Sequence, residues 1–134
     1  MNPIPKAEYI KHRLNRAQET LAEARMLFEG NHLAGAVNRI YYALFYAVSA
    51  LALAYDFTTS SHTQLRGYFN REFVKTGVVP VEMGKLYTLA YDNRTTGDYA
   101  DFPTFESEKI ASMLENAHNF IAMLTDLVTR QNIS

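Results

Sequence analysis

Four residues that could handle a phosphate group lie close together between two segments of helical pattern: Asp92, Arg94, Asp98 and Tyr99. An arginine guanidinium can hold a phosphate by two parallel hydrogen bonds and can stabilise the charge of a phosphoryl transition state. The Tyr99 hydroxyl can donate a hydrogen bond or attack an activated nucleotide. This pattern predicts phosphate chemistry. The alternative is structural, with Arg94 capping the preceding helix and pairing with Asp98.

Histidine is a second source of acid–base chemistry. His62 opens a predicted helix after Thr-Thr-Ser-Ser, where its side chain can either cap the helix or line a cleft. The chain also has one Glu-x-x-His element, Glu115 to His118, whereas di-iron helical bundles need two. At 100° per residue, both of its side chains lie off the inward face. Because cysteine and a Gly-rich phosphate loop are also absent from the sequence, we expect neither a metal site nor a cofactor.

The elements that must position these residues are helices. Apolar side chains recur at alternating spacings of three and four, which places them on one helix face. The predicted helices cover residues 6–29, 32–56, 62–75 and 81–92, followed by a last helix that starts near residue 104. Five amphipathic helices with short connections predict an all-α, antiparallel up-and-down bundle. A length of 134 residues predicts a single domain over residues 1–134.

The predicted helix over residues 32–56 has a second face besides its core face. Five residues recur on it at helical spacing, namely Arg39, Tyr42, Tyr46, Ser49 and Leu53. This face is apolar in bulk but carries polar tips, which is typical of an interface or a pocket. The alternative is that it packs against another helix of the same chain.

Composition and charge narrow the class of protein. A hydrophobic fraction of 48% excludes a disordered chain, and a net charge of −1 removes the uniformly basic signature of a nucleic-acid binder. Residues 1–40 hold six basic and four acidic side chains, whereas residues 81–134 hold four and eight. The longest uncharged apolar stretch, residues 40–55, is shorter than the roughly 20 residues that a membrane span needs. We therefore expect a cytoplasmic protein with no membrane partner.

Several segments in this order resemble the HEPN domain superfamily, and most closely its small stand-alone prokaryotic branch. They are NRIYYALFYAVSALA (38–52), His62 with RGYFNREFVKTG (66–77), and Arg94 with Gly97-Asp98-Tyr99. The resemblance covers roughly residues 5 to 128, which is nearly the whole chain.

The resemblance implies a helical bundle that forms homodimers and has an RNA- or nucleotide-linked function. Many HEPN proteins are metal-independent ribonucleases, often toxins paired with a minimal nucleotidyltransferase. Their signature is R-x(4–6)-H, in which the His moves a proton and the Arg stabilises the phosphorane. Here Tyr99 stands where that His is expected, and Tyr46 stands where the first segment often carries His. In toxin pairs the nucleotidyltransferase adds AMP to a tyrosine near the motif, and Tyr99 resembles that acceptor.

Three functions remain open. The first is a HEPN homodimer that binds nucleotide or RNA and works with a minimal nucleotidyltransferase. The second is a metal-independent ribonuclease toxin with a degenerate Arg-x(4)-Tyr motif, and the third is a non-catalytic helical interaction module. By the resemblance, the catalytic candidates are Arg94 and Tyr99, and the candidates for binding nucleotide or RNA are Arg39, Tyr42, His62, Arg94 and Asp98.

Overall fold

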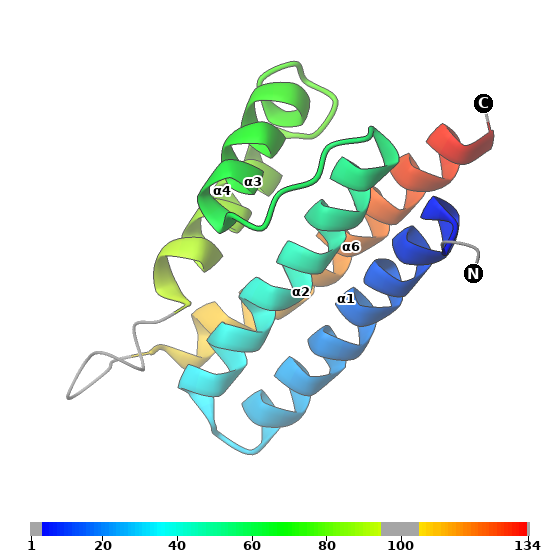
Figure 1. The fold of residues 1–134 in the computed structure, drawn as a ribbon. Helices are drawn as coiled ribbons and strands as arrows, with labels where there is room; N and C mark the ends of the chain where they lie inside the picture. The colour runs from blue at the N-terminus through cyan, green and yellow to red at the C-terminus, as the bar shows by residue number, and fades with distance from the viewer. Residues whose placement is uncertain (1–3, 95–104, 134) are drawn as a thin grey trace.

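The computed structural model describes residues 4–94 and 105–133, and within these ranges every regular element is a helix. The elements are α1 (Lys6–Glu29), α2 (Leu33–Ala54), α3 (His62–Phe69), the π-helix η1 (Asn70–Val74), α4 (Val81–Asn93) and α6 (Ser107–Ile133). Figure 1 shows them arranged as an up-and-down bundle, with the long helices α1, α2 and α6 side by side. The predicted all-α fold is confirmed.

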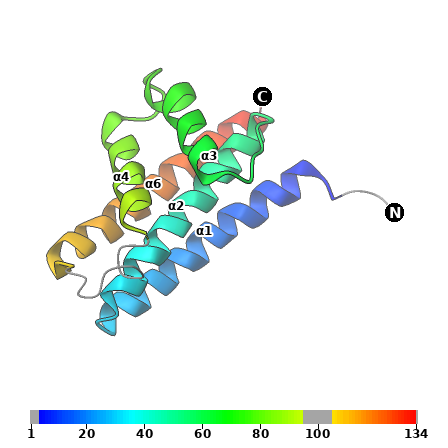
Figure 2. The same cartoon turned by 60° about the vertical axis from the view of Figure 1, so that its left-hand side comes forward.

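The central element of the bundle is α2. It contacts α1, α3, α4 and α6, and Figure 2 shows α3 and α4 packed on the side of α2 that α1 leaves uncovered. The α2 sequence explains this position, because its one charged residue is Arg39 and its alanines let neighbouring helices approach closely. By length and composition alone α2 could cross a membrane. Most of its apolar stretch, however, is buried against the other helices, as in the core helix of a bundle.

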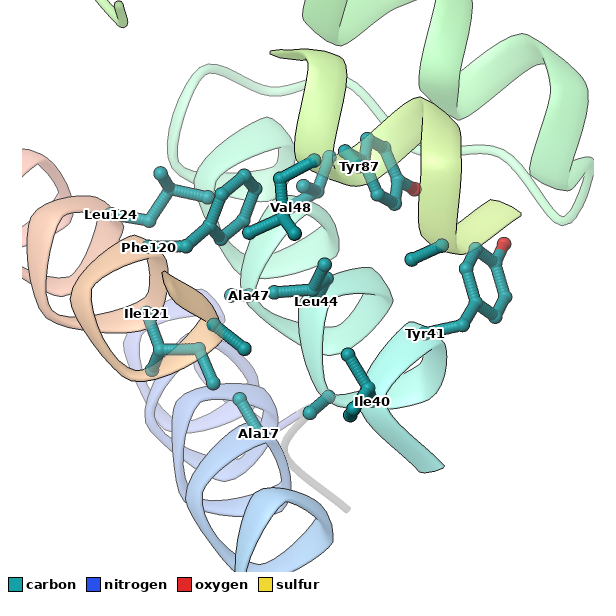
Figure 3. Close-up of a cluster of buried hydrophobic side chains, with 14 of the residues drawn as sticks. Ala17, Ile40, Tyr41, Leu44, Ala47, Val48, Tyr87, Phe120, Ile121 and Leu124 are labelled. Carbon is teal, nitrogen blue, oxygen red and sulfur yellow. The ribbon is translucent and has the colours of Figure 1, made fainter. Parts of the chain in front are cut away.

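The core forms where the predicted apolar stripes meet. In α6 every residue of the predicted stripe is buried: Ile110, Leu114, Ala117, Ile121, Leu124 and Val128. Figure 3 shows Phe120 and Leu124 reaching toward Val48 of α2, while Tyr87 of α4 closes the other side. Burying one such large apolar side chain stabilises the fold by roughly 1.5–3 kcal/mol.

The connection between α2 and α3 decides where α3 begins. The chain turns at residues 55–56, and the residues up to 61 then run back along α2 (Figure 1). Asp56 takes a positive φ of 64°, and its carboxylate accepts a hydrogen bond of 2.8 Å from Lys6. The Ser61 hydroxyl then caps α3 by accepting a hydrogen bond from the backbone N–H of Gln64. As a result, His62 lies beside the middle of α2.

The helices differ from the sequence prediction mainly in two places, apart from shifts of one or two residues at the ends of α2 and α4. The predicted helix over residues 62–75 is divided, because the Lys75 N–H bonds the Asn70 carbonyl five residues earlier and forms the π-helix η1. The turn after η1 uses Gly77 at a φ of 83°, a conformation that suits glycine. The last helix begins at Ser107 and not near residue 104.

Candidate functional site

Aromatic and basic side chains from three helices gather at one place on the bundle. We call this set the tyrosine–arginine cluster. Its members are Asn38, Arg39, Tyr41, Tyr42 and Phe45 of α2, His62, Thr63 and Arg66 of α3, and Tyr91 and Arg94 at the end of α4.

The His62 ring is held by three side chains of α2. It stacks on Phe45 with a centroid separation of 4.4 Å and meets the Tyr42 ring edge-on at 5.9 Å. Its Nδ1 forms a 2.5 Å hydrogen bond with the Tyr41 hydroxyl. Together these contacts fix the imidazole in orientation and leave it partly exposed.

Protonation of the His62–Tyr41 pair follows from burial. Burial, together with the positive charge of Arg94, lowers the pKa of His62, so the imidazole is neutral near pH 7. Burial raises the pKa of the Tyr41 hydroxyl to about 12, so it keeps its proton. Tyr41 is therefore the donor in this hydrogen bond, and the imidazole proton stands on Nε2.

Arg94 lies at the C-terminal end of α4 with its guanidinium folded back over the cluster. The guanidinium carbon is 4.0 Å from the centroid of the Tyr91 ring and 5.4 Å from that of Tyr41. One guanidinium nitrogen donates a hydrogen bond to the Tyr91 carbonyl, so the predicted capping of this helix does occur. The Arg94 carbonyl accepts a 3.1 Å hydrogen bond from the amide of Asn38, which ties the end of α4 to α2.

Arg39 joins the cluster through two neighbours on α2. Its guanidinium donates two hydrogen bonds, of 3.3 and 3.0 Å, to the Asn38 side-chain oxygen. The guanidinium carbon also lies 5.0 Å from the centroid of the Tyr42 ring. Asn38 therefore links Arg39 to the backbone of Arg94.

The electrostatic character of the cluster is positive. It holds the guanidiniums of Arg39, Arg66 and Arg94, and none of these forms an ion pair with a carboxylate in the part of the chain that the structure describes. Aromatic faces attract such cations, which keeps them in place on the surface. Over the same ranges, no three His, Cys, Asp or Glu side chains gather as metal ligands would. The arrangement suits an anion that takes hydrogen bonds from several guanidiniums.

The candidate residues from the sequence fall into two groups. Four of them, Arg39, Tyr42, His62 and Arg94, lie in the cluster, whereas Asp98 and Tyr99 lie outside the described residues. Sequence reasoning missed Tyr41, Arg66 and Tyr91 as members. Tyr41 had a signal, since it belongs to the R-x-YYA segment. Arg66 had a signal of the same kind, since it opens the segment 66–77. Tyr91 had none, because only the pairing of α3 with α4 brings it to the cluster.

Similarity to known proteins extends over nearly the whole chain. The HEPN domain model matches residues 10–127. The chain belongs to the HEPN domain family. A UPF0332 protein of Thermotoga maritima is 43% identical over 123 residues, which are 92% of this chain and 93% of that protein. The HEPN domain therefore spans almost all of the sequence, as the resemblance implied.

Two archaeal relatives carry a name that bears on function. Both come from Methanocaldococcus jannaschii and are named "Putative toxin MJ0142" and "Putative toxin MJ0605". The first is 29% identical over 90% of this chain and 82% of its own length. The second is 32% identical over 85% of this chain and 84% of its own length. This HEPN protein is thus similar to proteins named as toxins along most of its length.

Proposed function

We propose that this HEPN protein binds the phosphate groups of RNA or of a nucleotide at the tyrosine–arginine cluster. We also propose that it is one half of a two-component, toxin–antitoxin-like module with a minimal nucleotidyltransferase. One observation carries the binding proposal. The Arg94 guanidinium is fixed against the Tyr91 and Tyr41 rings without a carboxylate partner among the described residues. A guanidinium in this state is ready to bind a phosphate in two-point fashion.

The partner is proposed on the family and on the toxin-named relatives. Its test is co-expression with any nucleotidyltransferase encoded beside this gene, followed by pull-down and mass spectrometry of the recovered HEPN protein. We expect a stable complex and a mass increase of one AMP that is lost in Tyr99→Phe. Failure of the two proteins to associate, together with an unmodified Tyr99, would contradict the two-component role.

Binding is tested separately, with the HEPN protein alone. We expect Arg94→Ala to weaken binding of labelled RNA or nucleotide, because it removes the guanidinium that lies over the Tyr91 and Tyr41 rings. Arg130→Ala is the matched control, since Arg130 pairs with Asp126 on the exposed surface of α6. If Arg94→Ala binds as tightly as the wild type, Arg94 is not the binding residue. If the wild type itself binds neither RNA nor nucleotide, the chain is better described as a non-catalytic interaction module.

A metal-independent ribonuclease is the second candidate, and the His62–Tyr41 pair beside Arg94 favours it. Neutral His62 could take the proton of a ribose 2′-hydroxyl while the 2′-oxygen attacks phosphorus and the P–O5′ bond breaks. The leaving 5′-oxygen would take a proton from water, and His62 would return its own proton to the hydroxide so formed. The products would be a 2′,3′-cyclic phosphate and a 5′-hydroxyl, and Arg94 would stabilise the charge on the phosphorane. Nε2 of His62 can accept the 2′-hydroxyl proton only after the imidazole proton has moved to Nδ1. There the Tyr41 oxygen can accept the hydrogen bond of the Nδ1–H group.

Growth and cleavage assays test this activity. Induced expression of the wild type should arrest growth, and Arg94→Ala and His62→Ala should each relieve the arrest. Purified protein should cleave RNA in the presence of EDTA. A wild type that is harmless and leaves RNA intact would remove the ribonuclease from consideration without affecting the binding proposal.

Assembly and location complete the proposal. In a single chain the second face of α2 is half-buried, and its Tyr42 and Tyr46 side chains are partly exposed. The Arg16 guanidinium carbon lies 5.2 Å from the centroid of the Tyr46 ring. We propose that a second copy covers this face, or the ends of α3 and α4, in a cytoplasmic homodimer. Light scattering at micromolar concentration should give twice the protomer mass of 15.3 kDa. A monomeric mass would contradict this part of the proposal.

A further inference from the structure

The ring of Tyr91 is shared by two guanidiniums. The guanidinium carbon of Arg66, from α3, lies 4.4 Å from the ring centroid, and that of Arg94 lies 4.0 Å from it. The Tyr91 hydroxyl forms a 2.7 Å hydrogen bond with Thr63 in the first turn of α3. The ring is therefore anchored to one helix while it belongs to another, and it holds the two cations in a fixed relation.

Two like charges held this close are unfavourable unless something offsets them. Both carbons lie within 4.4 Å of one centroid, so they are separated by no more than about 9 Å. At that distance the charges still interact across a surface, since the Debye length is about 8 Å at physiological salt. The ring face offsets part of the repulsion, and no carboxylate of the described residues forms an ion pair that offsets the rest. An anion bound to both guanidiniums would relieve it.

The groove between α4 and α6 differs from this pair of guanidiniums in its charge. The cavity between α4 and α6 has a volume of about 760 Å³, and its walls carry the carboxylates of Glu82, Glu106 and Glu108 against the ammonium groups of Lys85 and Lys109. Lys109 is paired with Glu106, so the charge of this groove is mixed and slightly negative, which makes it a poorer place for phosphate than a surface of guanidiniums alone. The guanidiniums of Arg66 and Arg94, in contrast, belong to partly exposed residues and lie over the partly exposed ring of Tyr91. An open basic surface with aromatic side chains is typical of proteins that bind single-stranded nucleic acid.

We infer that Arg66, Tyr91 and Arg94 form a two-guanidinium clamp for the backbone of single-stranded RNA. Each arginine binds one of two neighbouring phosphates, or both hold a single phosphate from two sides. Tyr91 acts as a positioning residue that spaces them. This inference rests on the proposed function, and it adds Arg66 and Tyr91 as residues and the RNA backbone as the ligand.

The test is fluorescence anisotropy of a short labelled single-stranded RNA, measured over a series of salt concentrations. Arg66→Gln should weaken binding about tenfold, because it removes a charge-assisted hydrogen bond. The slope of log K against log salt should become shallower by about 0.7 for each phosphate that the variant no longer neutralises. The effect should be similar for RNAs of different sequence, since phosphate contacts carry no sequence information.

Three further variants separate positioning from folding. Tyr91→Phe keeps the ring between the two guanidiniums but removes the bond to Thr63 that anchors it, so it should weaken binding less than Tyr91→Leu does. Tyr91→Leu removes the ring and should weaken binding as much as Arg66→Gln does. Arg71→Gln is the matched control, because Arg71 also lies over a tyrosine ring, at 6.0 Å, but pairs with Glu72. Circular dichroism should show the same helix content in all of these proteins.

The outcomes are distinct. If Arg66→Gln and Tyr91→Leu bind RNA like the wild type while Arg94→Ala does not, the clamp is overturned and the proposed binding at Arg94 stands. If a mononucleotide competes as well as the RNA at equal phosphate concentration, the assignment to an RNA backbone is wrong. A wild type that binds neither RNA nor nucleotide overturns both the clamp and the proposed function.

Discussion

Replacing two stacked tyrosines by phenylalanine should have opposite effects on stability. The rings of Tyr41 and Tyr87 are nearly parallel, with centroids 6.1 Å apart and an angle of 6° between them, and both side chains are 0% exposed. Figure 3 shows them entering the same region from α2 and α4. Their hydroxyls differ. That of Tyr41 is bonded to His62, whereas that of Tyr87 lies near the Tyr41 hydroxyl without meeting the geometry of a hydrogen bond to any described residue.

The size of each effect follows from this difference. Tyr41→Phe leaves every ring contact in place and removes one hydrogen bond, which costs about 0.5–1.5 kcal/mol of unfolding free energy. Tyr87→Phe removes a buried polar group that gave up its hydration on folding, which costs roughly 1–3 kcal/mol when it is not compensated. Tyr87→Phe should therefore leave stability unchanged or raise it by about 1 kcal/mol. The two variants should differ by about 1–2 kcal/mol.

Urea denaturation followed by far-ultraviolet circular dichroism at about pH 7.5 measures the difference, since the chain has no tryptophan to report on the core. Both phenols are protonated at that pH, because burial raises the pKa of Tyr41 to about 12 and that of Tyr87 well above its ordinary value. Equal m-values would show that the unfolded states are comparable. If Tyr87→Phe destabilises the protein as much as Tyr41→Phe, the Tyr87 hydroxyl has a partner and the reasoning is refuted.

Three other perturbations have clear expected signs. Gly67→Ala should raise the free energy of unfolding by up to about 1 kcal/mol, since an added Cβ there meets nothing within 4 Å. Gly84→Ala should lower the free energy of unfolding by about 1 kcal/mol, because its Cβ would lie 3.0 Å from two methyls of Val74. Chemical denaturation checks both. Arg94→Gln should raise the pKa of His62 only part of the way to its ordinary value, because burial is the larger cause, and NMR titration of the ring protons would detect a full return or no change. The free energy of unfolding should fall as the pH drops below about 6.5, because His62 binds a proton there in the unfolded chain but not yet in the folded protein. His62→Asn should flatten this part of the pH profile.

The helices were predictable because their apolar spacing is a local property. The predicted helix over residues 6–29 is α1, and the stripe of α6 is buried at each predicted position. The division of residues 62–75 could not be predicted in this way. A π-turn depends on how η1 packs against α4, where Gly84 allows the close approach of Val74. No periodicity in the sequence records that contact.

The site was predictable only in part. The resemblance indicated Arg94 and His62, because both belong to motifs of fixed order, but it gave no reason for them to be neighbours. That neighbourhood depends on residues 55–61, whose return along α2 sets the starting point of α3. Tyr41 was missed for a different reason. It lies between the two predicted stripes of its helix, so spacing assigned it to neither, yet it is fully buried.

The distribution of charge matters more than its total. A net charge of −1 neither favours nor excludes RNA, yet three arginines stand in the cluster without a carboxylate partner among residues 4–94 and 105–133. The groove between α4 and α6 is lined instead by three glutamates, Glu82, Glu106 and Glu108, against two lysines, Lys85 and Lys109. A polyanion approaching this protein is attracted by one surface and repelled by the next, so the pattern orients it before any specific contact forms. Replacing the three glutamates by glutamine should therefore broaden RNA binding over the surface, whereas changes to Arg66, Tyr91 or Arg94 should weaken it at the cluster.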